Sequence, residues 1–163
     1  MSKRVVPLVL LVVVVVGGLW VRRYFSPAEV VKRSTLAVIA DFENESILAV
    51  MAKISRSYSD PWGQSYESVA GNLRELMETY DDLRVDVELS EPEVAEGEAR
   101  LPLSFVLSGR IDNSQGYVLG SLADPCTATL LWRTEQSGWK LASTEKLDIP
   151  ELRDELAAAR SDR

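Results

Sequence analysis

Hydrophobic and polar residues follow three different patterns along this chain, and the first is an unbroken apolar run. The seventeen residues 5–21 carry no charge, in a chain where 26% of residues are charged. At a rise of ~1.5 Å per residue such a helix extends about 25 Å, near the lower limit for crossing a bilayer core. We therefore predict a transmembrane signal-anchor helix over residues 5–21, behind a short N-terminal head of residues 1–4.

A cleaved secretory signal is the alternative for this run. Lys3 and Arg4 would form its basic head and residues 8–16 its apolar stretch, but no A-x-A cleavage site follows. Arg22 and Arg23 lie just after the run, so basic residues flank both sides and the positive-inside rule gives no clear orientation. The short basic head is typical of a signal-anchor, which predicts a single-pass protein of the cell membrane with an exported soluble domain.

Helical signals follow the apolar run. Ser26, Pro27 and Glu29 have the order of an N-cap, a first helical position and a capping box, so a helix is expected from Pro27 to about Phe42. A second helix is expected over residues 47–57.

A third helix is predicted from its N-cap at Ser65 to Tyr80. Its apolar residues recur every three or four positions and form one stripe, which is the pattern of a helix that covers a core. The stripe comprises Tyr66, Val69, Ala70, Leu73, Leu76, Met77 and Tyr80.

The period then changes to two, which predicts strands with one buried and one solvated face. Strands are expected at residues 83–89, 99–107, 117–133 and 139–144, and hairpin turns at residues 91–98, 111–116 and 135–138. The long third strand is expected to be interrupted near Asp124 and Pro125, because proline cannot join the ladder. Helices followed by hairpins predict an α+β domain with an antiparallel sheet on three helices. We assign it to residues 26–147, before a C-terminal helix and tail at residues 148–163.

Composition excludes several classes of function. The chain has 18 basic and 25 acidic residues; without the four basic residues beside the apolar run, the remainder carries a net charge of −11. Such a domain is repelled by nucleic acid. Histidine is absent and Cys126 is the one cysteine, which excludes a disulfide within the chain, histidine-assisted nucleophiles and ordinary zinc sites. We expect Cys126 to be a buried thiol, and no metal or cofactor to be bound.

Two segments resemble the nuclear transport factor 2-like superfamily, over roughly residues 27–147. They are residues 57–63 (SYSDPWG), after the second helix, and residues 135–141 (EQSGWKL), in the last hairpin. The resemblance implies a curved sheet whose concave face and helices enclose a conical pocket. Some members are enzymes, such as ketosteroid isomerase, scytalone dehydratase and limonene epoxide hydrolase, and others only bind a partner or a lipophilic molecule. The layout of head, span and exported domain also resembles the inner-membrane assembly component of type IV secretion machines.

Residues 60–63 (DPWG) are similar to the Asp-Pro-x-Gly segment that carries the general base of ketosteroid isomerase. The resemblance implies that Asp60 would take a proton alpha to a carbonyl, and that Trp62 would line the pocket beside a flat ligand. Two donors of the isomerase are missing: residues 34–38 contain no tyrosine, and Thr127 or Thr129 matches its neutral carboxylic acid. Asp before Pro-x-Gly is also an ordinary turn signature.

The sequence thus predicts a non-catalytic domain that binds a protein partner, a second copy of itself or an apolar ligand. No catalytic residue is assigned, and Asp60 and Trp62 are the candidate ligand-binding residues. The alternative is a carboxylate-dependent isomerase or hydrolase that uses Asp60 in a conical pocket. An open apolar pocket ending on Asp60 would favour the enzyme, and a pocket filled by core side chains would favour the binding module.

Overall fold

The computed structural model describes residues 25–111 and 114–150. The predicted head (residues 1–4), the predicted anchor (residues 5–21) and the predicted C-terminal helix beyond Pro150 lie outside these residues. None of the helices within the described ranges combines the length and the apolar character needed to cross a membrane.

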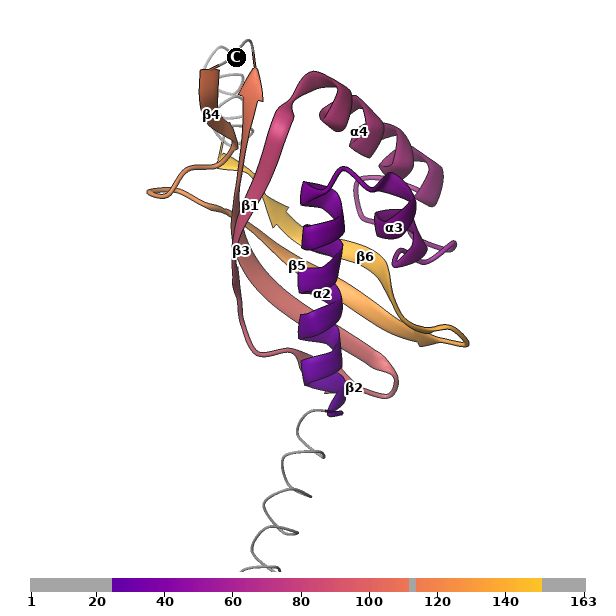
Figure 1. Ribbon diagram of the computed structural model, residues 1–163. Helices are drawn as coiled ribbons and strands as arrows, with labels where there is room; N and C mark the ends of the chain where they lie inside the picture. Colours follow the sequence, from indigo (N-terminus) through magenta and orange to yellow (C-terminus); the bar gives the residue numbers. More distant parts are fainter. Residues whose placement is uncertain (1–24, 112–113, 151–163) are drawn as a thin grey trace, which may run out of the picture.

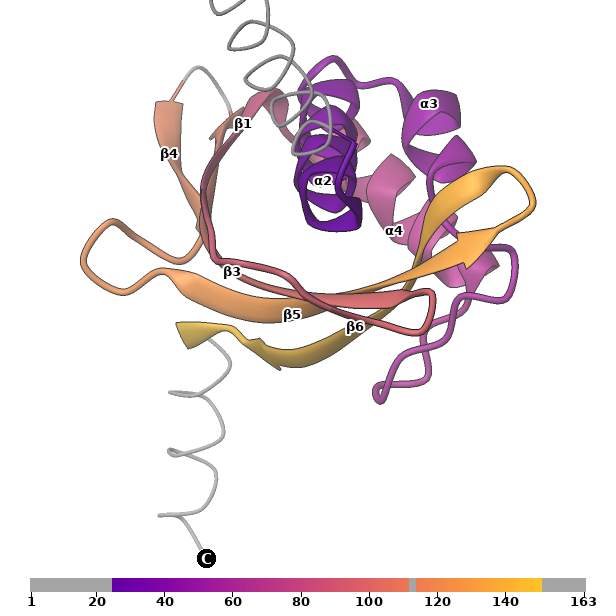
Figure 2. The same cartoon turned by 90° about the horizontal axis from the view of Figure 1, so that it is seen from below.

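Within the described residues, three helices precede a six-stranded antiparallel sheet. The helices are α2 (Pro27–Glu43), α3 (Ile47–Ala52) and α4 (Tyr66–Thr79). The strands are β1 (Asp81–Leu89), β2 (Glu93–Ala95), β3 (Glu98–Ile111), β4 (Ser114–Leu119), β5 (Cys126–Glu135) and β6 (Gly138–Asp148). The sheet runs in the order β1-β3-β5-β6, and β2 and β4 also pair with β3. It curves around the helices, which lie on its concave face (Figures 1 and 2). The predicted α+β class is confirmed.

Helix α2 begins where the sequence predicts. The Ser26 hydroxyl accepts a hydrogen bond from the Glu29 backbone N–H at 3.3 Å, and Pro27 occupies the first position. At the other end, the Glu43 carboxylate accepts the backbone N–H of Val85 at 2.9 Å. This bond ties the last residue of α2 to strand β1, and Val31 on the same helix is fully buried.

Helix α3 ends at Ala52, five residues before the predicted end, because the chain leaves the helix to pair with β6. The Leu141 N–H donates to the Lys53 carbonyl at 3.0 Å, and the Ser55 N–H donates to the Leu141 carbonyl at 2.8 Å. Backbone groups engaged in this way cannot also continue a helix. The segment 53–59 therefore covers the first half of the β6 edge.

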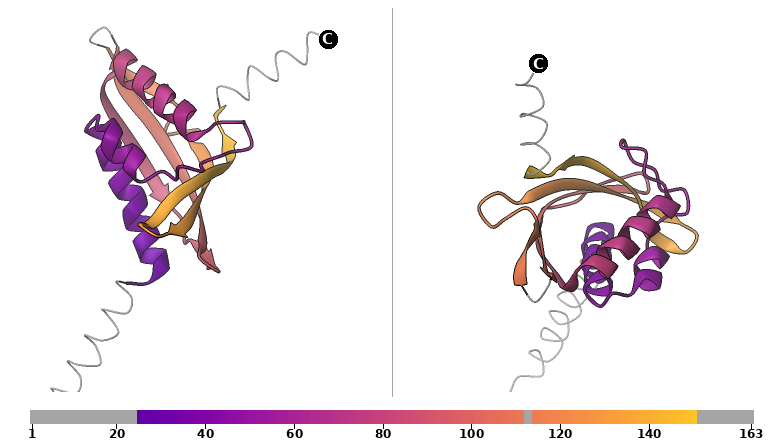
Figure 3. Two further views of the ribbon diagram at one scale, coloured as in Figure 1. Left: turned by 90° about the vertical axis from the view of Figure 1, so that its right-hand side faces the viewer. Right: turned by 90° about the horizontal axis from the view of Figure 1, so that it is seen from above.

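Helix α4 begins after its predicted N-cap Ser65 with a capping box, and it ends at Thr79, one residue before the predicted end. The Ser68 N–H donates to the Ser65 hydroxyl at 3.4 Å, and the Ser65 N–H donates to the Ser68 hydroxyl at 2.7 Å. The predicted stripe packs against the core, but no residue of α4 is fully buried. Figure 3 shows α4 across α3 at one end of the sheet. The stripe faces the core without being enclosed by it.

Two predicted details of the sheet differ from the structure. Residues 91–98 hold the short strand β2, so the turn shrinks to Glu96 and Gly97, both with positive φ. The predicted interrupted strand at residues 117–133 is two strands, β4 and β5, which pair one after the other along β3. The break between them follows Gly120, whose φ of +66° favours glycine.

The core lies between the helices and the concave face. Leu83, Leu101 and Trp132 are fully buried there, and Cys126 is a buried thiol as predicted. Successive side chains of a strand point to opposite faces. Leu101 faces the core, so its neighbour Pro102, with the residues paired to it, faces the convex side.

Candidate functional site

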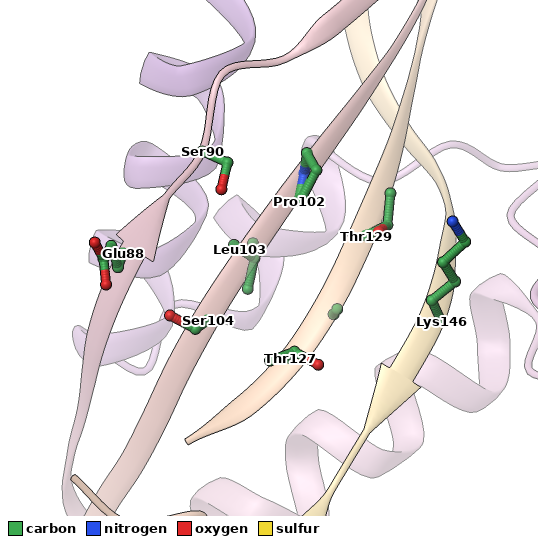
Figure 4. A pocket seen from close by; sticks show the side chains of 9 residues that line it. Glu88, Ser90, Pro102, Leu103, Ser104, Thr127, Thr129 and Lys146 are labelled. Carbon is green, nitrogen blue, oxygen red and sulfur yellow. The ribbon is translucent and has the colours of Figure 1, made fainter. Parts of the chain in front are cut away.

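A trough of about 500 Å³ crosses the convex face of the sheet (Figure 4). It is lined by Glu88, Ser90, Pro102, Leu103, Ser104, Thr127, Ala128, Thr129 and Lys146. Glu88 and Lys146 lie on its two sides, on β1 and β6, with hydroxyl groups between them (Figure 4). Several of these side chains are exposed, and the trough does not enclose apolar surface, so it has the character of a solvated sheet face.

Thr127 and Thr129 belong to this trough, which corrects their assignment from the sequence. The sequence match equates them with the sheet carboxylic acid of ketosteroid isomerase, which would face the pocket under the helices. Thr129 pairs with Pro102 on the convex face, whereas Leu130 pairs with Leu101 on the concave face. The match is therefore wrong by one residue, and one residue moves a side chain to the opposite face.

A separate cavity of about 230 Å³ lies between the helices and the concave face. Eight apolar side chains and two hydroxyl-bearing side chains line it: Val38, Ile39, Phe42, Val50, Ile54, Val69, Leu73 and Leu141, with Tyr58 and Thr144. A cavity of roughly 150 Å³ already admits benzene. This cavity is large enough for one ring with a small substituent.

The polar end of the cavity is built by Tyr58 and Thr144. Tyr58 is 7% exposed, and its hydroxyl lies 3.0 Å from the Thr144 hydroxyl and 3.3 Å from Oδ2 of Asp60. The two residues meet because the segment after α3 runs along β6, where the Ser59 N–H donates to the Ala142 carbonyl at 3.2 Å. The pairing that ends α3 thus also brings the tyrosine to the cavity.

The environment of Tyr58 keeps its hydroxyl protonated. Burial raises the pKa of Tyr58 above its ordinary 10.0; the hydrogen bond with the Thr144 side chain acts in the opposite direction, and the negative charge of Asp60 adds to the rise. Because the net pKa shift is upward, Tyr58 is a neutral hydroxyl at physiological pH. It can both donate and accept a hydrogen bond.

Asp60 lies behind Tyr58 and has both carboxylate oxygens engaged. Oδ1 accepts the backbone N–H groups of Trp62 at 3.0 Å and Gln64 at 2.9 Å, which are the bonds of an Asx turn. Oδ2 faces the Tyr58 hydroxyl. Asp60 does not line the cavity, so a ligand inside meets Tyr58 and Thr144 rather than the carboxylate.

Trp62, the other candidate from the sequence, is 48% exposed on the same turn and does not line the cavity. Sequence reasoning also missed Thr144. A period of two places residues 141, 143 and 145 on one face of β6, but a register shift pairs Leu141 with Trp132 and Thr144 with Leu130. This bulge turns Thr144 inward. Tyr58 had a visible signal, a tyrosine two residues before Asp60 in the segment that carries the family resemblance.

The described part of the chain offers no set of three Asp, Glu or Cys side chains that could hold a metal ion. The polar chemistry at the cavity is therefore that of two neutral hydroxyls backed by one carboxylate.

No protein-family model and no curated protein matches the sequence. Several solved structures do resemble the fold. The protein Aln2 from a Streptomyces species is similar with a TM-score of 0.63 and 9% identity, over 80% of this chain and 97% of that protein. A provisionally named dehydratase of the NTF2-like family from Streptomyces avermitilis has a TM-score of 0.61 and 13% identity, over 72% of this chain and 92% of that protein.

A ketosteroid isomerase-like protein from Erwinia carotovora atroseptica has a TM-score of 0.54 and 15% identity, over 74% of this chain and 94% of that protein. Identities this low establish the fold and leave the activity open. The domain of residues 25–150 has the nuclear transport factor 2-like fold, with three helices on a curved antiparallel sheet.

Proposed function

We propose that this domain is a non-catalytic binding module that takes a small, mainly apolar ligand into the cavity under α2, α3 and α4. The observation that carries the proposal is the cavity itself: about 230 Å³, lined by eight apolar side chains and one pair of hydroxyls. Sites of this composition bind by removing apolar ligand surface from water, while a few polar groups set the orientation.

The size of the cavity sets the expected affinity. A single ring that buries about 150 Å² of apolar surface gains roughly 4 kcal/mol at 25 cal/mol per Å². Part of this gain is offset by lost translational and rotational freedom, and contact with the lining atoms adds to it. We expect dissociation constants of about 0.1–1 mM for single-ring probes.

The position of Asp60 supports binding over catalysis. A general base must come within hydrogen-bond reach of the proton that it removes. Here Tyr58 lies between Asp60 and the cavity, and two backbone N–H groups hold Oδ1 in the turn. The carboxylate is oriented toward its own loop.

A carboxylate-dependent isomerase or hydrolase is the second candidate. It is favoured by the 3.3 Å contact through which Asp60 reaches Tyr58, and by structural neighbours whose names include dehydratase and isomerase-like. Asp60→Asn distinguishes the two, because the amide oxygen can still accept the turn N–H groups. If Asp60→Asn lowers a measurable turnover by several orders of magnitude, the domain is an enzyme. If the variant leaves the cellular activity of the protein unchanged, the result supports the binding module.

The binding proposal is tested with toluene as the probe. Methyl NMR of the full-length chain in lipid nanodiscs would follow the methyl groups of Ile39, Ile54 and Leu73 during titration. Val69→Phe fills the cavity and should abolish the shifts. Val94→Phe, at a position that is 41% exposed on β2, should leave them unchanged. Absence of toluene binding to the native chain, or equal binding by both variants, would refute the proposal.

In the same proposal, residues 5–21 anchor the chain in the cell membrane with the domain exported. Their lack of any charged residue supports it. The protein should stay in the membrane pellet after carbonate extraction and retain Met1 or Ser2. Recovery of a soluble form that begins near Leu19 would show that the run is a cleaved signal.

A further inference from the structure

Three polar groups stand in series between the cavity and the outer turn. Thr144 lies on the cavity lining, the Tyr58 hydroxyl is 3.0 Å from it, and Asp60 Oδ2 is 3.3 Å beyond Tyr58. We call this series the hydroxyl relay. It joins β6 to the turn after α3 and ends on a negative charge outside the cavity.

The charge sets the direction of the protons along the relay. The Asp60 carboxylate can only accept, and a hydrogen bond to a charged oxygen is roughly twice as strong as one between neutral groups. The Tyr58 hydroxyl is placed to donate to both oxygens, Thr144 Oγ1 at 3.0 Å and Asp60 Oδ2 at 3.3 Å, but it has only one proton. With that proton on the charged oxygen of Asp60, the Thr144 hydroxyl has to supply the proton of the 3.0 Å contact.

With its proton committed to Tyr58, the Thr144 oxygen presents lone pairs to the cavity. A ligand hydroxyl can donate to that oxygen and extend the relay by one bond, and hydrogen bonds in series strengthen one another. A ketone of the same shape brings only an acceptor. Its oxygen would face the Thr144 oxygen without a proton between them. A carboxylate would also meet the field of Asp60.

We propose that the hydroxyl relay makes the cavity selective for small cyclic alcohols and phenols over ketones of the same shape. This inference rests on the proposed function, because it names the class of ligand that the same cavity takes. One neutral hydrogen bond corresponds to about a 3- to 10-fold preference.

The test compares cyclohexanol, cyclohexanone and toluene on the full-length chain in lipid nanodiscs. Titrations would follow the methyl signals of Ile39, Ile54 and Leu73, which line the cavity. Empty nanodiscs give the partition of each probe into lipid, so that free concentrations are known. We expect cyclohexanol to bind about 3- to 10-fold more tightly than cyclohexanone.

Two variants probe the relay itself. Thr144→Val removes the hydroxyl at nearly constant volume and should bring the two probes to within about twofold of each other. This is the result expected when the one discriminating hydrogen bond is gone. Thr134→Val, at an exposed position on β5 outside the cavity, should keep the native preference.

Asp60→Asn should reverse the preference. The amide oxygen can keep the turn N–H groups of Trp62 and Gln64, while the amide nitrogen donates to Tyr58. Tyr58 then donates to Thr144, whose proton turns toward the cavity, and cyclohexanone becomes the better ligand. A general loss of stability would weaken both probes and could not exchange their order.

The outcomes separate the inference from the proposed function. If toluene does not bind, the proposed function and the hydroxyl relay are both refuted. If toluene binds but the native chain does not prefer cyclohexanol, or Asp60→Asn keeps that preference, the relay is refuted and the cavity stands.

Discussion

The difference between an enclosed and a cavity-lining leucine predicts two distinct costs for the same mutation. Leu83 on β1 is fully buried, and its Cδ2 would lie 3.1 Å from a Cβ built on Gly109. Leu73 on α4 is partly buried and borders the 230 Å³ cavity. Leu83→Ala therefore opens a new hole in packed surroundings, whereas Leu73→Ala enlarges a hole that already exists.

Replacing Leu with Ala removes three carbon atoms, worth roughly 2.4 kcal/mol when all leave a dry environment at 0.8 kcal/mol each. For Leu83 a cavity term adds to this, and we expect a loss of about 3–5 kcal/mol in the free energy of unfolding. Leu73 is only partly buried and packs on one side, so its replacement loses only part of the transfer free energy. We expect its substitution to lose about 1–2 kcal/mol.

Urea unfolding of the fragment 26–163, which contains the whole core, measures both changes. The exposed neighbour Arg74 is the control on the same helix, and Arg74→Ala should change the free energy of unfolding by less than about 0.5 kcal/mol. Equal losses at Leu73 and Arg74 would mean that the stripe does not face the core. A loss at Leu73 as large as that at Leu83 would mean that the cavity is closed and packed.

Three further predictions concern single residues. The raised pKa of Tyr58 stabilises the fold fully below pH 10.0, where the unfolded tyrosine is still protonated, and this stabilisation is lost as pH rises through the folded pKa. Urea unfolding between pH 9 and about 11.5 should show this loss in the native protein and in Tyr117→Phe. The loss should be absent in Tyr58→Phe. Gly120→Ala should lower the free energy of unfolding by more than about 2 kcal/mol, because φ is +66° and the new Cβ would lie 2.9 Å from the Cys126 nitrogen; a neutral result would mean that the loop relaxes. Ser65→Ala should lower it by about 1 kcal/mol through loss of the capping box, and an unchanged denaturation midpoint would show that α4 does not need its cap.

Local signals predicted most of the fold because they act within a few residues. The N-caps Ser26 and Ser65 and the alternation in β1 and β3 were all readable from the sequence. The end of α3 was not, because it depends on Leu141, nearly ninety residues away, offering its backbone groups to Lys53 and Ser55. Long-range backbone pairing thus ended the helix although the local sequence pattern was helical.

The candidate site was less predictable for the same reason. Asp60 and its turn could be recognised, but its relation to the cavity depends on Tyr58, which is aimed by pairing along β6. Thr144 reaches the cavity only because a bulge shifts the register of β6 against β5. The match of Thr129 to a pocket residue was wrong because Thr129 pairs with Pro102 on the convex face, one position away from Leu130 on the concave face. Strand faces can be assigned from a sequence only where the alternation is unbroken.

The segment that ends α3 also covers part of an edge strand of the sheet. An edge strand presents unpaired backbone groups that can recruit a strand from another molecule and start aggregation. Residues 53–59 already occupy the β6 edge at Leu141 and Ala142, and further along Lys146 breaks the flat edge with a φ of +50°. Loosening of this segment would therefore withdraw Tyr58 from the cavity and expose the backbone groups of the β6 edge in a single step, so that the proposed ligand site and the protection of this edge depend on the same residues.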